Sequence, residues 1–204
     1  MRLLIVVPCG DTVRYEFAES LAKLCIQLGE DGVDFDVKFH EGSLVYAARE
    51  ELAIAAIDEH FTHVLWLDSD IQFTRDLFNI LYRVGKPFVT GIYRSRRYPY
   101  APALFSSVAT AQRVLKWPNV PFQVEACGFG CVLTDVEVLM EVRRHYGTCF
   151  TPTPEHGEDI AMCKRYRDIG GEVWATPDAC VNHMTYVPLR TGDCAKLCEY
   201  KEQI

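Results

Sequence analysis

His63-Val64-Leu65-Trp66-Leu67-Asp68-Ser69-Asp70 is a short apolar run that ends in two carboxylates. The apolar part, residues 63–67, predicts a buried parallel strand. Because side chains alternate along an extended chain, we expect Asp68 and Asp70 on one side and Ser69 on the other. Two adjacent carboxylates repel each other, and a divalent cation such as Mg²⁺ or Mn²⁺ removes that penalty. The stretch therefore predicts a cation site, suited to a diphosphate, at the sheet edge where open α/β proteins bind ligands.

The composition indicates one globular domain. The chain has 204 residues, of which 49% are hydrophobic, and a formal net charge of −7. This charge argues against nucleic acid as a partner, because a general nucleic-acid binder needs a basic face. No apolar run approaches the ~18 residues of a transmembrane helix, so no membrane insertion is expected. The nine cysteines show no zinc-site spacing, which favours reduced thiols and a cytoplasmic location over a secreted disulfide framework.

Strand and helix patterns alternate in the first half of the chain. Strands are expected at residues 2–8, 33–39, 63–67, 88–93, 122–133 and 172–175, with a hairpin within 103–117. Helices are expected after residues 16, 43, 74, 134 and 157, with Ser43, Thr74 and a capping box at Thr134–Glu137 as N-terminal signals. This order predicts an α/β domain over residues 1–187 with a largely parallel sheet. Residues 188–204 are expected to form a tail or a linker to further domains.

The ordered set of motifs resembles the GT-A glycosyltransferases. The set consists of the Asp-Ser-Asp strand end after two β-α units, a glycine-rich strand at Gly128-Phe129-Gly130, and the helix start Gly157-Glu158-Asp159. The resemblance covers residues 1–187 and implies a Rossmann-type three-layer α/β/α domain with a mixed, mainly parallel sheet. It also implies a hexosyltransferase that uses a nucleotide-sugar donor, expected to be a UDP-sugar. The implied acceptor is a hydroxyl of a glycan or a glycoprotein.

Metal and nucleotide ligands follow from this resemblance. It implies that Asp70 binds the metal directly, with Asp68 and His183 as further ligands, and an imidazole ligand favours Mn²⁺ over Mg²⁺. An ordinary histidine remains the alternative for His183. The implied nucleotide-binding residues are Pro8, Cys9, Gly10, Asp36, Arg49, Asp68 and Ser69. Arg49 resembles the arginine with which the family contacts its nucleotide, and a solvated helix face beside Glu50 is the alternative.

The donor sugar and the acceptor are expected near the glycine-rich strand. The candidate contacts are Gly128, Phe129, Gly130, Glu125 and Arg94. Glycines let backbone amides approach sugar hydroxyls, and Phe129 offers a ring for stacking, but a β-bulge or close strand packing explains the same motif. Arg94 begins a basic and aromatic segment with Arg96 and Arg97, for which closure over the diphosphate, glycan stacking and a plain solvated loop stay open.

Catalysis is expected at the start of the helix after residue 157. If the enzyme inverts the anomeric centre, a carboxylate must take the proton of the acceptor hydroxyl, and we expect Asp159 as that base with Glu158 orienting the acceptor. If it retains configuration, the same residues only bind sugar, and the sequence leaves the stereochemistry open. Carboxylates are also ordinary in the first turn of a helix.

Two other classes of function remain. A metal-dependent phosphatase or nucleotidyltransferase also uses an Asp-x-Asp pair, and a non-catalytic sugar-binding module would need no turnover. The segment Leu67–Ile71 and the chain length are also similar to those of glycosyltransferase domains of large algal viruses that are linked to capsid glycosylation. This similarity implies a viral protein that acts in the host cytoplasm.

Overall fold

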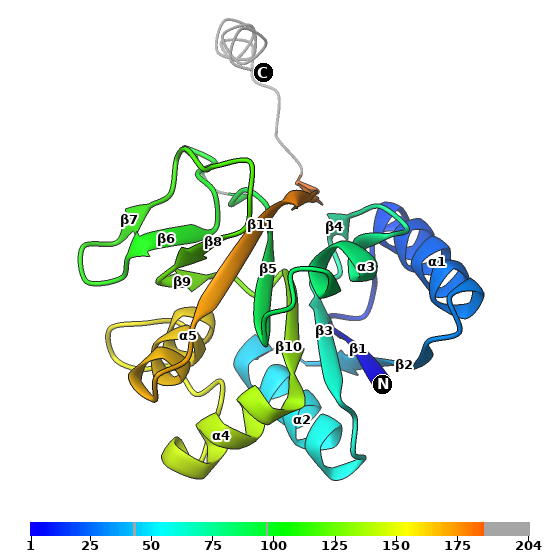
Figure 1. The fold of residues 1–204 in the computed structure, drawn as a ribbon, viewed down its shortest axis with the longest axis horizontal. Coiled ribbons are helices and arrows are strands. Elements are labelled where there is room, and N and C mark those ends of the chain that lie inside the picture. Colours follow the sequence, from blue (N-terminus) through cyan, green and yellow to red (C-terminus); the bar gives the residue numbers. More distant parts are fainter. Residues whose placement is uncertain (43, 97, 186–204) are drawn as a thin grey trace, which may run out of the picture.

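The computed structural model describes residues 1–42, 44–96 and 98–185. A central seven-stranded sheet has the order β2-β1-β3-β10-β5-β11-β8, with helices on both faces (Figure 1). Its strands are β1 Arg2–Cys9, β2 Asp34–Glu41, β3 His63–Leu67, β5 Phe88–Ile92, β8 Phe122–Val124, β10 Cys131–Asp135 and β11 Val173–Cys180. The helices are α1 Tyr15–Glu30, α2 Val45–Asp58, α3 Leu77–Tyr82, α4 Val136–Tyr146 and α5 Glu158–Asp168.

Alternation along the central strands produces two hydrophobic cores, one on each face of the sheet. In β3, Trp66 belongs to the core formed with α2, α4 and α5, whereas Leu65 and Leu67 belong to the core formed with α1 and α3. The connection from β1 to β2 and the connection from β2 to β3 run in opposite directions across the sheet. Right-handed crossovers therefore place α1 and α2 on opposite faces. The result is the three-layer α/β/α architecture that was predicted.

The sheet is mixed and mainly parallel, as expected. β1 runs parallel to β2 and β3, and β5 runs parallel to β11. β10 is inserted antiparallel between β3 and β5, and β8 is antiparallel to β11 at the sheet edge. Because β10 follows the glycine-rich motif, its antiparallel direction brings that motif back to the carboxyl end of β3.

Two small sheets complete the described fold. β4 Ile71–Gln72 pairs with β12 Asn182–His183, which joins the chain after β3 to the chain after β11. β6 Leu104–Ser107 pairs with β7 Gln112–Arg113 and with β9 Ala126–Cys127. The pairing of β6 with β7 is the hairpin that was predicted within residues 103–117. No helix among the described residues is long and apolar enough to cross a bilayer.

Several expectations about helix starts are wrong. Thr74 does not cap a helix, because α3 begins only at Leu77 and its N-cap is Asp76. Thr134 is not the first residue of a capping box, since it is buried in β10 and its hydroxyl accepts a hydrogen bond from Trp66 Nε1 at 3.0 Å. The core strand Val173–Cys180 also extends further than residues 172–175. Ser43, Arg97, the domain boundary at residue 187 and the tail 188–204 lie outside the described residues.

Candidate functional site

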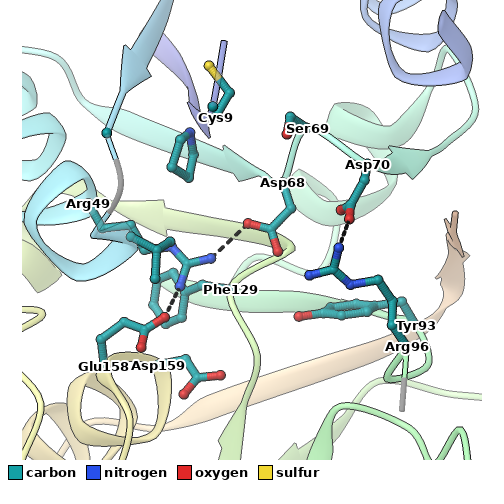
Figure 2. A pocket seen from close by; sticks show the side chains of 14 residues that line it. Cys9, Arg49, Asp68, Ser69, Asp70, Tyr93, Arg96, Phe129, Glu158 and Asp159 are labelled. Carbon is teal, nitrogen blue, oxygen red and sulfur yellow. Dashed lines mark hydrogen bonds and ion pairs between the residues drawn. The ribbon is translucent and has the colours of Figure 1, made fainter. Parts of the chain in front are cut away.

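A cavity of about 390 Å³ opens at the carboxyl ends of β1 and β3 (Figure 2). Its lining consists of Pro8, Cys9, Gly10, Gly42, Val45, Arg49, Asp68, Ser69, Asp70, Tyr93, Arg96, Phe129, Glu158 and Asp159. Figure 2 shows the Asp68 and Asp70 side chains directed to the same side. The structure thus brings together most of the residues that the sequence singled out, and the lining comes from six separate parts of the chain.

Arg49 is the centre of the ion pairs in this cavity. One guanidinium nitrogen lies 2.8 Å from Asp68 Oδ1 and the other lies 2.7 Å from Glu158 Oε1. The Arg49 side chain is only 4% exposed, and its guanidinium lies 5.6 Å from the centre of the Phe129 ring. Burial alone would lower the pKa of Arg49, but the carboxylates of Asp68 and Glu158 raise it above its usual value. Arg49 therefore stays charged, and the alternative of a solvated helix face is wrong.

His183 reaches Asp70 through the β4–β12 ladder. Ile71 pairs with His183 in this ladder, and the amide of Met184 donates to the carbonyl of Asp70 at 2.8 Å. The imidazole Nδ1 lies 2.8 Å from the carbonyl oxygen of Arg94, so Nδ1 carries the proton and donates. Nε2 lies 3.2 Å from Asp70 Oδ1. Burial lowers the pKa of His183, but the contacts with Asp70 and with the Arg94 carbonyl outweigh it and raise this pKa above its usual value. Apart from the Asp70 carboxylate, the buried Nε2 atom has no partner among the described residues.

This pair has the chemistry of part of a metal site. When the His183 ring is neutral, the lone pair of Nε2 and an oxygen of Asp70 converge, and the Nδ1 hydrogen bond is the kind that fixes a metal-binding imidazole. Asp68 does not join them, because its Oδ1 pairs with Arg49. Accordingly, the described residues contain no group of three or more His, Cys, Asp or Glu side chains placed to hold a metal ion. One carboxylate and one imidazole suffice for Mn²⁺ or Mg²⁺ when water and substrate phosphates supply the other ligands.

Asp159 is the carboxylate of this site that has no ion-pair partner within 4.0 Å among the described residues, and its Oδ1 accepts a hydrogen bond from the Ile160 amide at 2.7 Å. Burial, followed by the charge of Glu158, raises the pKa of Asp159 above its usual value. Asp159 also lines a second cavity of about 350 Å³, which it shares with Tyr93, Arg96 and His183 beneath the β6–β7 hairpin. It therefore lies where the two cavities meet.

The glycine-rich motif has a packing role. A Cβ atom on Gly128 would lie 2.2 Å from the Tyr93 hydroxyl oxygen, and one on Gly130 would lie 2.9 Å from the Tyr93 ring and 3.0 Å from Asp68 Oδ2. The Gly130 amide also donates to the Tyr93 hydroxyl at 2.9 Å. Both glycines thus admit Tyr93, which corresponds to the alternative of close strand packing. The sequence places Tyr93 only at the start of the basic and aromatic segment, and no local pattern indicates its contact with the glycines.

Phe129 does not offer its ring for stacking on a sugar. Its side chain is 1% exposed and packs edge-on against Trp66, Phe88 and Phe150. With Arg49 over the same ring, Phe129 supports the floor of the cavity from below. The expectation of pyranose stacking is wrong because the ring belongs to the hydrophobic core.

Several expected residues do not line this cavity. His183 and Gly128 line the second cavity, and Gly130 packs against Tyr93. Glu125, Asp36 and Arg94 belong to neither cavity. Glu125 accepts a hydrogen bond from the Val108 amide at 2.7 Å and lies near Arg167, so it stabilises the β6–β7 hairpin. Asp36 pairs with Leu4, five residues before the end of β1, or about 16 Å from the sheet edge. Arg94 donates to the Tyr100 carbonyl and contributes its own carbonyl to His183.

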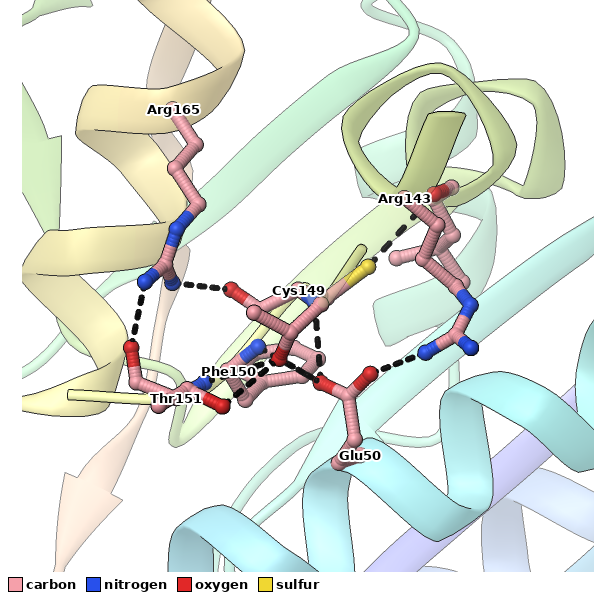
Figure 3. A network of polar contacts seen from close by, with 8 residues as sticks. Glu50, Arg143, Cys149, Phe150, Thr151 and Arg165 are labelled. Carbon is pink, nitrogen blue, oxygen red and sulfur yellow. Dashed lines mark hydrogen bonds and ion pairs between the residues drawn. The ribbon is translucent and has the colours of Figure 1, made fainter. Parts of the chain in front are cut away.

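A polar network behind the cavity holds the segment that leads to α5 (Figure 3). Glu50, the neighbour of Arg49 on α2, accepts hydrogen bonds from the Thr148 hydroxyl at 2.9 Å and from the amides of Cys149 at 2.9 Å and Phe150 at 2.7 Å. It also pairs with Arg143 of α4. Phe150 lies 4.9 Å from Phe129 between ring centres, so this network supports the floor beneath Arg49.

We expect Glu50→Ala to lower the free energy of unfolding by about 3 kcal/mol, because it leaves two backbone amides and Arg143 without their partner. For a chain of this size the loss corresponds to a fall in Tm of about 6–12 °C, measurable by calorimetry. Glu51→Ala is the matched control, since Glu51 is 65% exposed on the same helix. An equal effect of both substitutions would show that the network does not carry this stability.

No protein-family model and no curated protein matches the sequence. Among solved structures, the chain is similar to the protein A197 from STIV, at 16% identity and a TM-score of 0.65, over 91% of this chain and 87% of that one. It is also similar to GalNAc-T7 in a crystal structure with UDP, GalNAc and Mn²⁺, at 10% identity and a TM-score of 0.60. That match covers 93% of this chain but only 44% of the GalNAc-T7 chain. The fold is GT-A-like, as predicted.

Proposed function

We propose that the protein is a metal-dependent glycosyltransferase that moves a sugar from a UDP-sugar to a hydroxyl of a glycan or a glycoprotein. The observation that carries this proposal is one cavity at the carboxyl edge of a GT-A-like sheet, lined by the ion pair of Asp68 with Arg49 and by Asp70, whose carboxylate lies 3.2 Å from His183. The presence of UDP and Mn²⁺ in the GalNAc-T7 structure supports the choice of donor and metal.

In this proposal the nucleotide lies over Pro8, Cys9 and Gly10 at the end of β1. Arg49 and Asp68 are fixed by each other, so neither has to reorganise when the donor binds. Asp70 and His183 would hold Mn²⁺ or Mg²⁺. When bound, such an ion supplies positive charge that stabilises a departing diphosphate.

Asp159 is proposed as the base that removes the proton of the acceptor hydroxyl. Its carboxylate has no ion-pair partner among the described residues and faces both cavities, so an acceptor in the cavity beneath the β6–β7 hairpin would meet it. Glu158 is engaged with Arg49, and its role in orienting the acceptor stays a prediction. This arrangement fits an inverting transfer, in which one carboxylate acts as the general base.

The ion pair of Asp68 argues against the phosphatase alternative. A phosphatase would use the first aspartate of the pair as a free nucleophile, whereas Asp68 Oδ1 is bound to a buried arginine at 2.8 Å.

The resemblance to algal-virus domains makes a capsid glycoprotein one acceptor to test.

Thermal unfolding with nucleotide-sugars provides the direct test. We expect one UDP-sugar to raise the Tm in the presence of Mn²⁺ and to have little effect with a chelator, because a ligand at 100 times its Kd stabilises by about 2.7 kcal/mol. UDP-GalNAc, UDP-glucose and GDP-mannose form the first panel. Stabilisation by a sugar without nucleotide, unaffected by the chelator, would instead support a sugar-binding module.

A further inference from the structure

Arg96 makes an ion pair with Asp70 inside the candidate site (Figure 2). The contact joins the guanidinium to Asp70 Oδ2, while Oδ1 of the same carboxylate faces His183 Nε2. The Asp70 side chain is only 17% exposed, whereas the Arg96 side chain is 56% exposed. The arginine therefore approaches the carboxylate from the solvent side.

The segment that carries Arg96 touches both members of the proposed metal pair. Arg94 forms an isolated bridge with Pro102, and the Ser95 amide donates to the Ala101 carbonyl at 2.9 Å, so the base of the segment is anchored. The Arg94 carbonyl accepts the hydrogen bond of His183 Nδ1. Two residues later, Arg96 reaches Asp70. The base of the segment thus orients the imidazole while its arginine neutralises the carboxylate.

A divalent cation bound to Asp70 and His183 would lie close to the position that the Arg96 guanidinium now takes. Two cations on one small carboxylate repel each other, so binding of a divalent cation at Asp70 Oδ1 weakens the contact of Arg96 with Oδ2. Because Arg96 is more than half exposed, its ion pair is weak and easily exchanged. Arg96 also lines the cavity in which the diphosphate is expected, so a released guanidinium has a second anion within that cavity.

We propose that Arg96 is an exchangeable counterion: it occupies Asp70 in the ligand-free protein and transfers to the donor diphosphate when the metal binds. The proposal rests on the proposed function, since it requires a metal and a nucleoside diphosphate in this cavity. Its consequence is a coupling between the two ligands. The metal alone must break an ion pair for which it offers no replacement, whereas metal and diphosphate together provide Arg96 with a new partner.

Calorimetric titration of Mn²⁺ into the full chain, with and without UDP, tests this exchange. We expect Arg96→Gln to bind Mn²⁺ alone about two- to fivefold more tightly than the wild type, because the competing cation is gone. We also expect UDP to enhance Mn²⁺ affinity less in the variant than in the wild type. Arg144→Gln, which removes an equal charge from an exposed position on α4, should behave as the wild type in both titrations.

Unchanged or weaker binding of Mn²⁺ alone to Arg96→Gln would overturn the proposal, and so would an undiminished enhancement by UDP. An equal gain in affinity in Arg144→Gln would attribute the effect to net charge and would also overturn it. If the wild type binds neither Mn²⁺ nor UDP, the proposed function itself fails. If the wild type binds both ligands and Arg96→Gln binds them with the same affinities, only the proposed counterion exchange fails.

Discussion

Asp70→Ala is expected to abolish the metal-dependent binding of UDP while leaving the fold intact. Asp70 supplies the carboxylate of the proposed metal site, and the imidazole of His183 alone is a poor ligand set for Mn²⁺. We expect the affinity for UDP in the presence of Mn²⁺ to fall at least about 100-fold, or ~2.8 kcal/mol, to the value measured with a chelator. Isothermal titration calorimetry of UDP, with Mn²⁺ and with a chelator, measures both values.

The structure indicates that this substitution does not unfold the protein. The hydrogen bond that joins the segment after β3 to the segment after β12 uses the backbone carbonyl of Asp70, which alanine retains. Asp58→Ala, at the exposed end of α2, is the control for loss of one carboxylate. Undiminished affinity for UDP and Mn²⁺ in Asp70→Ala, with the control unaffected, would remove Asp70 from the proposed metal site.

The half of the site that follows β3 was predictable because its signal is local. An apolar strand that ends in Asp68 and Asp70 has one reasonable place in an α/β sheet, and alternation then sets the direction of both side chains. Arg49 was found through its resemblance to a nucleotide-contacting arginine, but its partners were not. Its hydrogen bonds to Asp68 and Glu158 join residues that are 19 and 109 positions away along the sequence. A local sequence pattern cannot predict contacts between residues so far apart in the chain.

The errors have a common physical origin in long-range packing. The sequence places Phe129 between the two glycines and Glu125 just before them, which suggests contact with the sugar, yet the two glycines make room for Tyr93, the residue after β5. Asp36 was placed near the nucleotide because its strand is adjacent to β1. Its register with Leu4 instead holds it about 16 Å before the sheet edge. Register between strands depends on the whole sheet and cannot be read from one strand.

Asp159→Asn is expected to lower the rate of sugar transfer by about 10²–10⁴-fold while leaving donor affinity nearly unchanged. The amide cannot accept the proton of the acceptor hydroxyl, but its oxygen can still accept the hydrogen bond from the Ile160 amide. Single-turnover transfer with the UDP-sugar found in the thermal panel measures the rate, and calorimetry measures donor binding. Asp168→Asn, at the exposed end of the same helix, should transfer sugar at the wild-type rate.

The pH dependence of stability separates a lost base from a damaged fold. Burial raises the pKa of Asp159, so the folded protein binds this proton more tightly than the unfolded chain does. Its contribution to stability is therefore complete at acid pH, below the pKa of Asp159 in the unfolded chain, and is lost as the pH rises through the higher pKa of the folded protein.

At neutral pH Asp159→Asn removes a buried carboxylate that is costly to ionise, so the Tm of the variant should equal or exceed that of the wild type. The wild-type transfer rate should rise with pH through the raised pKa of Asp159, and the variant should lack this rise. A variant that is stable and binds donor but transfers sugar at the wild-type rate would show that Asp159 is not the base, as a retaining mechanism requires.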